Sequence, residues 1–160
     1  MFRKMRRENQ NMSYAEIVEI LERATSGVLA VQGDGDYPYA VPLSYVYKDS
    51  KITFHCANAG HKLDAISKHD KVSFCIIHQD EIVPEKFTTL YKSVIIFGRA
   101  RVLGDDEAKR KALELVNEKY APDHAAAGSK LIDQVFGLAS VIELSIDHMT
   151  GKKSRHMVAE

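Results

Sequence analysis

The sequence has little of what a secreted or membrane-spanning protein usually carries. Only two cysteines, Cys56 and Cys75, occur among the 160 residues. Both stand inside apolar segments, where buried free thiols are expected rather than a disulfide. No apolar run approaches the roughly 18 residues of a membrane span. The basic start MFRKMRRENQ is not followed by the apolar segment of a secretory signal. These features predict a cytoplasmic location.

The sequence also carries no net charge. Lys+Arg and Asp+Glu both number 22, so the formal charge is zero. A balanced chain gives no electrostatic reason to expect binding to nucleic acid or to an anionic membrane. Hydrophobic residues make up 45% and charged residues 28%, as in globular proteins. We therefore expect a single domain over residues 1–160, with residues 1–12 as a flexible arm and residues 148–160 as a C-terminal tail.

The common catalytic and metal-binding motifs are absent from the sequence. It contains no GxGxxG, P-loop or GxSxG motif, and no CxxC, HExxH or HxxxH pair, so no metal site is expected. His55 and His78 stand in strand-like segments, where a lone histidine is more often structural than catalytic. His55 and Cys56 are neighbours on one strand, so their side chains point to opposite faces.

Hydrophobic periodicity predicts a mainly antiparallel β protein with peripheral helices. A capping-box pattern opens the first helix, and the helices are expected over residues 14–24, about 61–68, 105–120 and 129–136. Strands are expected over residues 27–32, 39–47, 52–57, 71–79, 91–103 and 137–146. Residues 80–89 are expected to form a loop, and Gly98 a bulge or bend. Hairpin-length links replace the βαβ alternation of a parallel sheet, which favours a small antiparallel barrel.

Pro42 interrupts a run that otherwise has the pattern of a central strand. Proline has no backbone N–H to donate, so one position of the hydrogen-bonded ladder is left open. The strand is then either an edge strand or a place where a planar ligand lies against the backbone. Ser44 faces the same side as Pro42 and could reach an oxygen of such a ligand.

Residues Gly60, His61 and Lys62 open a helix directly after a strand. The start of a helix exposes backbone N–H groups and the positive end of its dipole, which together favour an anion. Glycine allows close approach to the backbone, and Lys62 adds a positive charge. The alternative is a glycine N-cap followed by two solvated basic residues. Combined with Pro42, this feature indicates a flat, phosphorylated ligand.

Four segments carry a resemblance to a known family: AVPLSYVY at 40–47, FHCANAGHKLDAI at 54–66, YKSVIIFGRARV at 91–102 and SIDHMTGKKS at 145–154. In these segments the chain resembles the FMN-binding split-barrel proteins related to pyridoxamine 5'-phosphate oxidase, and among them the Nim-type 5-nitroimidazole resistance proteins. The resemblance implies a mainly β fold, an antiparallel Greek-key-type split barrel with peripheral helices. It also implies FMN held in clefts shared by the two subunits of a homodimer.

The resemblance further implies which residues form the site. Those lining the flavin ring would be Val41, Pro42, Leu43 and Ser44. The neighbouring strand of the site would contain Phe54, His55, Cys56 and Ala57. The phosphate would be held by His61 and Lys62, and the site rim or the partner subunit would contribute Tyr91 and Ser93. His55 would be the catalytic residue, donating a proton or a hydrogen bond to the substrate.

The implied function is that of an FMN-dependent oxidoreductase, a Nim-type nitroreductase that passes electrons from reduced flavin to a small nitroaromatic or similar acceptor. One alternative is a flavin- or haem-binding carrier or sensor without efficient catalysis. A second alternative is pyridoxamine-phosphate oxidase itself, but the chain lacks the arginine-rich segment expected near the C-terminal end of that enzyme.

Overall fold

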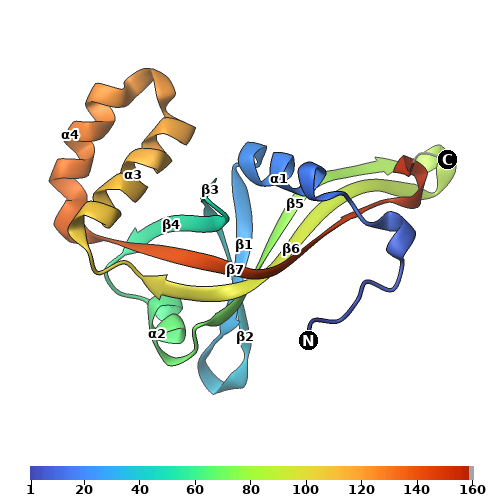
Figure 1. Ribbon diagram of the computed structural model, residues 1–160, viewed down its shortest axis with the longest axis horizontal. Helices are drawn as coiled ribbons and strands as arrows, with labels where there is room; N and C mark the ends of the chain where they lie inside the picture. Colours follow the sequence, from blue (N-terminus) through green and yellow to red (C-terminus); the bar gives the residue numbers. More distant parts are fainter. Residues whose placement is uncertain (159–160) are drawn as a thin grey trace.

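The computed structural model describes residues 1–158 as a seven-stranded antiparallel sheet with four α-helices (Figure 1). The order of strands in the sheet is β2-β1-β5-β6-β7-β4-β3. The strands are β1 (Ser26–Gln32), β2 (Pro38–Ser44), β3 (Val46–Lys48), β4 (Lys51–Ala57), β5 (Lys71–Val83), β6 (Thr88–Val102) and β7 (Ala139–Lys153). The helices are α1 (Tyr14–Arg23), α2 (His61–Lys68), α3 (Asp106–Tyr120) and α4 (Ala125–Val135). None of the helices within residues 1–158 combines the length and the apolar character needed to cross a bilayer.

The connection between β2 and β3 forces the sheet to close on itself. These strands lie at opposite edges of the strand order, yet Tyr45 alone separates them in the chain. In a flat sheet of seven strands the two edges would be about 29 Å apart. Two consecutive Cα steps span at most about 7.6 Å. The sheet must therefore curl round, which confirms the expected antiparallel barrel.

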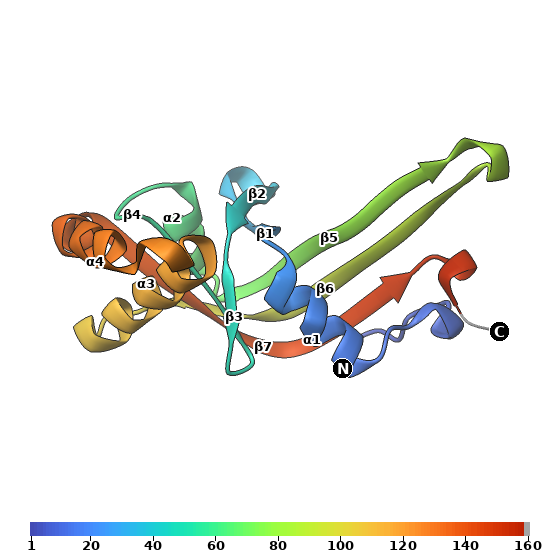
Figure 2. The same cartoon turned by 90° about the horizontal axis from the view of Figure 1, so that it is seen from above.

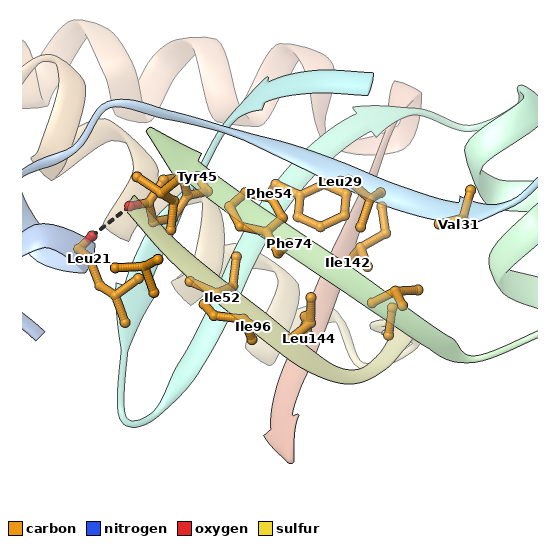
Figure 3. Packing of buried hydrophobic residues seen from close by; sticks show 14 of the residues in the cluster. Leu21, Leu29, Val31, Tyr45, Ile52, Phe54, Phe74, Ile96, Ile142 and Leu144 are labelled. Atoms are coloured by element: carbon orange, nitrogen blue, oxygen red, sulfur yellow. Dashed lines mark hydrogen bonds between the residues drawn. The ribbon is translucent and has the colours of Figure 1, made fainter. Parts of the chain in front are cut away.

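The barrel interior holds the main hydrophobic core (Figure 3). Alternate residues of each strand point inward, as Ile52 and Phe54 of β4 do, and both are fully buried. Helix α1 covers one end of the barrel with its own buried face. There the hydroxyl of the fully buried Tyr45 donates a hydrogen bond of 2.9 Å to the carbonyl of Leu21. The core thus joins α1 to the link between β2 and β3.

A second, smaller core lies outside the barrel. Helices α3 and α4 pack against each other and against the first half of β7, at one end of the molecule (Figure 1). Their shared core consists of Ala112, Leu113, Ile132 and Val141. The α3–α4 pair therefore covers the outer face of the sheet near β4 and β7. The other end of the molecule is formed by the long β5–β6 hairpin (Figure 2).

The expected loop over residues 80–89 is wrong. Strand β5 runs to Val83 and β6 begins at Thr88, so this segment forms the tip of a long hairpin around one short 3-10 turn, Pro84–Lys86. Most side chains near the tip are exposed. Because neither face of this part of the hairpin is buried, the sequence shows no alternation of apolar and polar residues there.

Three further boundaries differ from the sequence-based prediction. The run over residues 39–47 is broken at Tyr45 into β2 and β3. Helix α4 begins at Ala125, four residues before the helix expected over residues 129–136, and β7 continues to Lys153, through the first half of the expected tail. Of that tail, residues 159 and 160 lie outside the described part of the chain. In the expected arm, Gln10 and Met12 are buried, and the amide of Met12 donates to the carbonyl of Gly151 at 3.0 Å.

The bulge expected at Gly98 is confirmed. The pairing of β6 with β7 shifts register between Phe97 and Gly98. A Cβ atom at position 98 would collide with the backbone carbonyl of Ser145 on β7. Glycine is therefore required because another strand's backbone approaches closely.

The capping box of α1 gives a pH-dependent prediction. Glu16 accepts a hydrogen bond from the amide of Ser13 at 2.8 Å and pairs with Lys153 at 2.9 Å. Lys153, followed by the Ser13 amide, holds the pKa of Glu16 to about 2, below its ordinary 4.5. This stabilisation is present above pH 4.5 and is lost as the pH falls towards 2. Because Glu16 is partly exposed, we expect Glu16→Gln to cost only about 1 kcal/mol of unfolding free energy at pH 7.

The measurement is urea denaturation of Glu16→Gln and of the unsubstituted protein at pH 7 and near pH 2.5. Glu19→Gln is the matched control, because Glu19 pairs with Arg23 on the same helix but both side chains are mostly exposed. We expect the Glu16→Gln deficit to shrink at the lower pH and the control to change little. A deficit that is the same at both pH values would contradict the role assigned to the carboxylate.

Candidate functional site

The link at Tyr45 leaves a gap in the strand pairing of the barrel. Within residues 1–158, β2 is paired with β1 alone, and β3 is paired only with residues 51–53 of β4. Residues 54–57 of β4 therefore have a partner strand, β7, on one side only. We call these two unpaired edges, β2 and residues 54–57 of β4, the split. Its closed end is Tyr45, and its open end is the start of α2.

Side chains along the split divide between the core and the solvent. Four of the expected site residues face the barrel interior and belong to its core or pack against it: Val41, Leu43, Phe54 and Cys56. Four others alternate with them and are exposed on the outer face: Pro42, Ser44, His55 and Ala57. A ligand bound on the outer side of the split would meet the second group. The first group packs in the core beneath the two strands and holds them in place.

The start of α2 has the geometry of an anion site. Gly60 has φ 136° and ψ 164°, a conformation that only glycine adopts readily, and no atom lies within 4 Å of a Cβ built there. The amides of Leu63 and Asp64 bond to the carbonyl of Gly60, which leaves the earlier amides of the helix directed outward. Open space, free N–H groups and the positive end of the helix dipole therefore coincide at this point.

The loop before α2 is held by one side chain. The Asn58 amide group donates to the carbonyl of Gly137 at 2.7 Å, and its oxygen accepts from the Ser140 hydroxyl at 2.8 Å. Ser140 lies on β7 and Gly137 just before it. The start of α2 is therefore fixed to the body of the barrel before any ligand binds, which lowers the entropic cost of binding.

His61 uses its side chain to bridge α2 to β2. The ring stacks on Tyr39 with 4.2 Å between ring centroids, and Nε2 accepts a hydrogen bond of 3.2 Å from the amide of Asp34. The Asp34 carboxylate lies 3.7 Å from the same nitrogen. In this arrangement the ring forms a wall at the open end of the split, and its Nε2 is already engaged by Asp34.

The charge of Lys62 lies near the thiol of Cys56 on β4. Burial raises the pKa of the Cys56 thiol, and the nearby charge of Lys62 opposes that rise. Cys56 is therefore a neutral thiol near pH 7 and serves as a wall rather than as a nucleophile. Lys62 itself is half-buried and lies in the first turn of α2.

An apolar band crosses the outer face of the sheet and ends at Pro42. Strand pairing aligns one outward-facing residue from each of five strands, and we call this set the outer row: Pro42, Val28, Cys75, Ile95 and Thr150. A cavity of about 620 Å³ lies beside it, lined in part by Ala30, Ser73 and Phe97. His55, His61 and Lys62 do not line this cavity, so it extends the outer face rather than forming the split.

Ten of the twelve expected site residues thus surround the split, and two do not. Tyr91 and Ser93 are on β6, three strands away from β2 in the sheet. Ser93 is paired with Ile77 on one side and with Lys152 on the other. At the usual strand spacing these side chains are roughly 14 Å from β2. They share the outer face with Pro42 but not its immediate surroundings.

Sequence reasoning missed two groups at the split. Asn58 fixes the start of α2, and Tyr120, the last residue of α3, places its hydroxyl at the closed end. The contact between Tyr120 and Tyr45 joins residues 75 positions apart. Since Tyr120 ends an ordinary amphipathic helix, no local pattern marks it.

Residues 13–153 match a family model described as pyridoxamine 5'-phosphate oxidase. A comparison with curated proteins gives no match.

Solved structures share the whole architecture. A conserved hypothetical protein from Mycobacterium tuberculosis superposes with a TM-score of 0.83 at 19% identity, covering 98% of this chain and 94% of that one. An FAD- and haem-binding protein from Mycobacterium smegmatis gives 0.77 at 19% identity, over 94% and 76%. A candidate 5-nitroimidazole antibiotic resistance protein from Bacteroides thetaiotaomicron gives 0.76 at 20% identity, over 89% and 86%. At these identities the likeness is one of fold, and it includes the split barrel. Because the family model matches residues 13–153, which is most of the chain, the chain belongs to the pyridoxamine 5'-phosphate oxidase family.

Proposed function

We propose that the protein is an FMN-binding oxidoreductase that holds its flavin on the outer side of the split and passes electrons to a small acceptor such as a nitroaromatic compound. One observation carries the proposal: the start of α2, with its free amides and open space, lies at the end of an unpaired strand edge that bears Pro42. The similarity to flavin-binding and nitroimidazole-resistance proteins of the same fold supports it.

The residues of the split suit the parts of FMN. The phosphate would bind the first amides of α2 and Lys62. From Tyr39, which touches α2, to Pro42 the strand advances about 10 Å, so the flavin ring would lie over Pro42 and Ser44. The unpaired backbone groups of β2 and β4 can bond the polar edge of the ring. The flavin supplies the electron transfer, while the protein binds and orients it and positions the acceptor.

We further propose that two copies of the chain form the complete site. The outer row exposes apolar side chains, among them Ile95 at 42%, and the neighbouring Phe97 is 40% exposed. Contiguous apolar surface of this kind usually marks an interface. Because Tyr91 and Ser93 are too far from the split of their own chain, a second copy packed on this face is the way for them to reach a flavin. A homodimer also agrees with the sequence resemblance.

His55 is the proposed catalytic residue because its imidazole is exposed on the outer side of β4, beside the split. We expect His55→Ala to lower kcat for reduction of a nitro acceptor by roughly 100-fold, as for loss of a proton donor, while FMN affinity changes little. Stopped-flow turnover and FMN titration measure the two effects. His78→Ala, an exposed histidine of β5, is the control. Equal losses of turnover and binding in His55→Ala would indicate a structural role instead.

The experiment that tests the proposed function begins with the absorbance spectrum of the purified protein, followed by titration with FMN while its fluorescence is recorded. Flavin bands, or quenching of added FMN, are expected. Turnover is then measured with a chemical reductant and a nitro compound. Bound flavin without turnover would favour the carrier or sensor, and activity on pyridoxamine phosphate would favour the oxidase. A Soret-type band would favour haem, and neither colour nor quenching would reject flavin binding.

A further inference from the structure

We propose that Tyr120, at the C-terminal end of α3, is a positioning residue for the flavin site. Its hydroxyl fixes the closed end of the split and orients the hydroxyl of Ser44. The inference rests on the proposed function, since it concerns the site where we place the flavin. It assigns a role to a helix that lies outside the barrel and supplies none of the expected site residues.

The Tyr120 hydroxyl meets three backbone groups at the closed end. It accepts a hydrogen bond of 2.9 Å from the amide of Tyr45. It also lies 2.7 Å from the carbonyl of Tyr45 and 2.6 Å from the carbonyl of Thr25. With a single proton to donate, the hydroxyl serves one of the two carbonyls at a time. One phenol therefore connects the end of β2 to the residue before β1.

The backbone groups of Tyr45 lack the neighbouring strand that would pair with them in a continuous sheet, because the split interrupts the pairing at this point. Pairing of β1 with β2 ends at Ser26 and Ser44, so Tyr45 is the first residue beyond the ladder. Its amide and carbonyl would otherwise be left unpaired at a partly buried point, which is unfavourable. The Tyr120 hydroxyl replaces the missing strand at one position. It therefore determines where β2 stops and in which direction its last residues point.

Tyr45 is held firmly from the other side. Its ring is fully buried, lies edge-on to Phe74 at 5.2 Å, and is capped by the Lys119 ammonium at 4.3 Å from the ring centre. The same ammonium donates to the carbonyl of Ala24 at 2.7 Å. Since the side chain of Tyr45 cannot shift, its backbone is a rigid anchor. Because the Tyr120 hydroxyl bonds this backbone, the hydroxyl is itself held in one position at the closed end of the split.

Ser44 connects this anchor to the proposed ligand. Burial raises the pKa of Tyr120, and hydrogen bonds from Tyr45 and from the Ser44 side chain oppose the rise. Ser44 directly precedes Tyr45, whose amide and carbonyl both bond the Tyr120 hydroxyl, so the phenol is held next to Ser44. The Ser44 side chain is exposed on the same face as Pro42. A hydroxyl oriented by a fixed phenol can present its remaining hydrogen-bonding capacity to a flavin in one direction.

The test is a double-mutant cycle on FMN affinity with Tyr120→Phe, Ser44→Ala and the double variant. We expect Tyr120→Phe to weaken FMN binding roughly tenfold, as for the loss of one or two hydrogen bonds, and to shift the absorption bands of bound flavin. The double variant should bind no more weakly than the weaker of the two single variants, because Tyr120 acts on the flavin through Ser44. Lys109→Met is the matched control, because Lys109 lies near the other end of α3 and donates to the carbonyl of Phe136 at 2.6 Å. It is expected to lower thermal stability while leaving the flavin spectrum unchanged.

Two results would overturn the inference while leaving flavin binding intact. One is a Tyr120→Phe variant that loses thermal stability but keeps the affinity and spectrum of the unsubstituted protein. The other is a double variant whose losses multiply. If Tyr120→Phe does not fold, amide exchange at Tyr45 in the unsubstituted protein decides instead: we expect it to slow when FMN is added, and unchanged exchange would contradict the coupling. An unsubstituted protein that fails to bind FMN would reject the proposed function, and this role with it.

Discussion

Replacing Lys62 by alanine is expected to weaken FMN binding by roughly 10- to 100-fold. A hydrogen bond to a charged group contributes about 1.5 to 3 kcal/mol, and each 1.4 kcal/mol changes affinity about tenfold. Lys62 is half-buried beside Cys56, so its charge is less screened by water than that of a fully exposed lysine. The fixed amides of α2 remain in the variant, and for this reason binding should be weakened rather than abolished.

The measurement is FMN titration by fluorescence quenching at two salt concentrations. Lys68→Ala is the matched control, since Lys68 lies in the last turn of the same helix and is largely exposed near Asp34. We expect the control to bind FMN normally and the Lys62 variant to show a weaker dependence on salt. A Lys62→Ala protein that retains its full complement of yellow cofactor after dialysis would show that the phosphate binds elsewhere.

Replacing Phe54 by alanine is expected to destabilise the fold by about 3 to 5 kcal/mol, the usual range for deleting a buried aromatic side chain. Phe54 is fully buried in the barrel core, although it belongs to the strand that borders the split. Such a loss is a large part of the roughly 5 to 15 kcal/mol that stabilises an ordinary domain. Urea denaturation followed by circular dichroism measures it.

The neighbouring position provides the control for this prediction. His55 is exposed on the opposite face of β4, and we expect His55→Ala to change the unfolding midpoint hardly at all. Phe54→Leu should recover most of the stability. If Phe54→Ala is as stable as the unsubstituted protein but binds FMN poorly, then Phe54 is a ligand contact and the core packing described above is wrong.

The sequence allowed a good prediction wherever one residue type has one physical cause. Pro42 indicated an open ladder position, and it lies on a strand paired on one side only. Gly98 indicated a bulge, and it lies where the register shifts. The apolar alternation of residues 52–57 placed Phe54 and His55 on opposite faces, as observed. These signals are local, so they can be read without knowing the fold.

The features that were missed depend on contacts between distant parts of the chain. Tyr45 ends β2 because its ring enters the core beside Leu21 and because Tyr120 takes its backbone groups. Nothing near residue 45 reveals these partners. The hairpin tip was missed for a different reason. Neither face of its strands is buried, so the sequence there shows no alternation of apolar and polar residues. His61 was expected, with Lys62, to hold the phosphate; the sequence shows no sign that its side chain stacks on Tyr39, which lies 22 positions earlier in the chain.

The one-residue link at Tyr45 also restricts how the chain can change its length. An inserted or deleted residue there would shift either β2 or β3 by one position against its neighbour. Such a shift would turn the inward side chains of that strand, Val41 and Leu43 for example, towards the solvent. The tip of the β5–β6 hairpin carries no such restriction, because its side chains are exposed. Variation in length among relatives should therefore occur at residues 82–88, and position 45 should remain free of insertions and deletions.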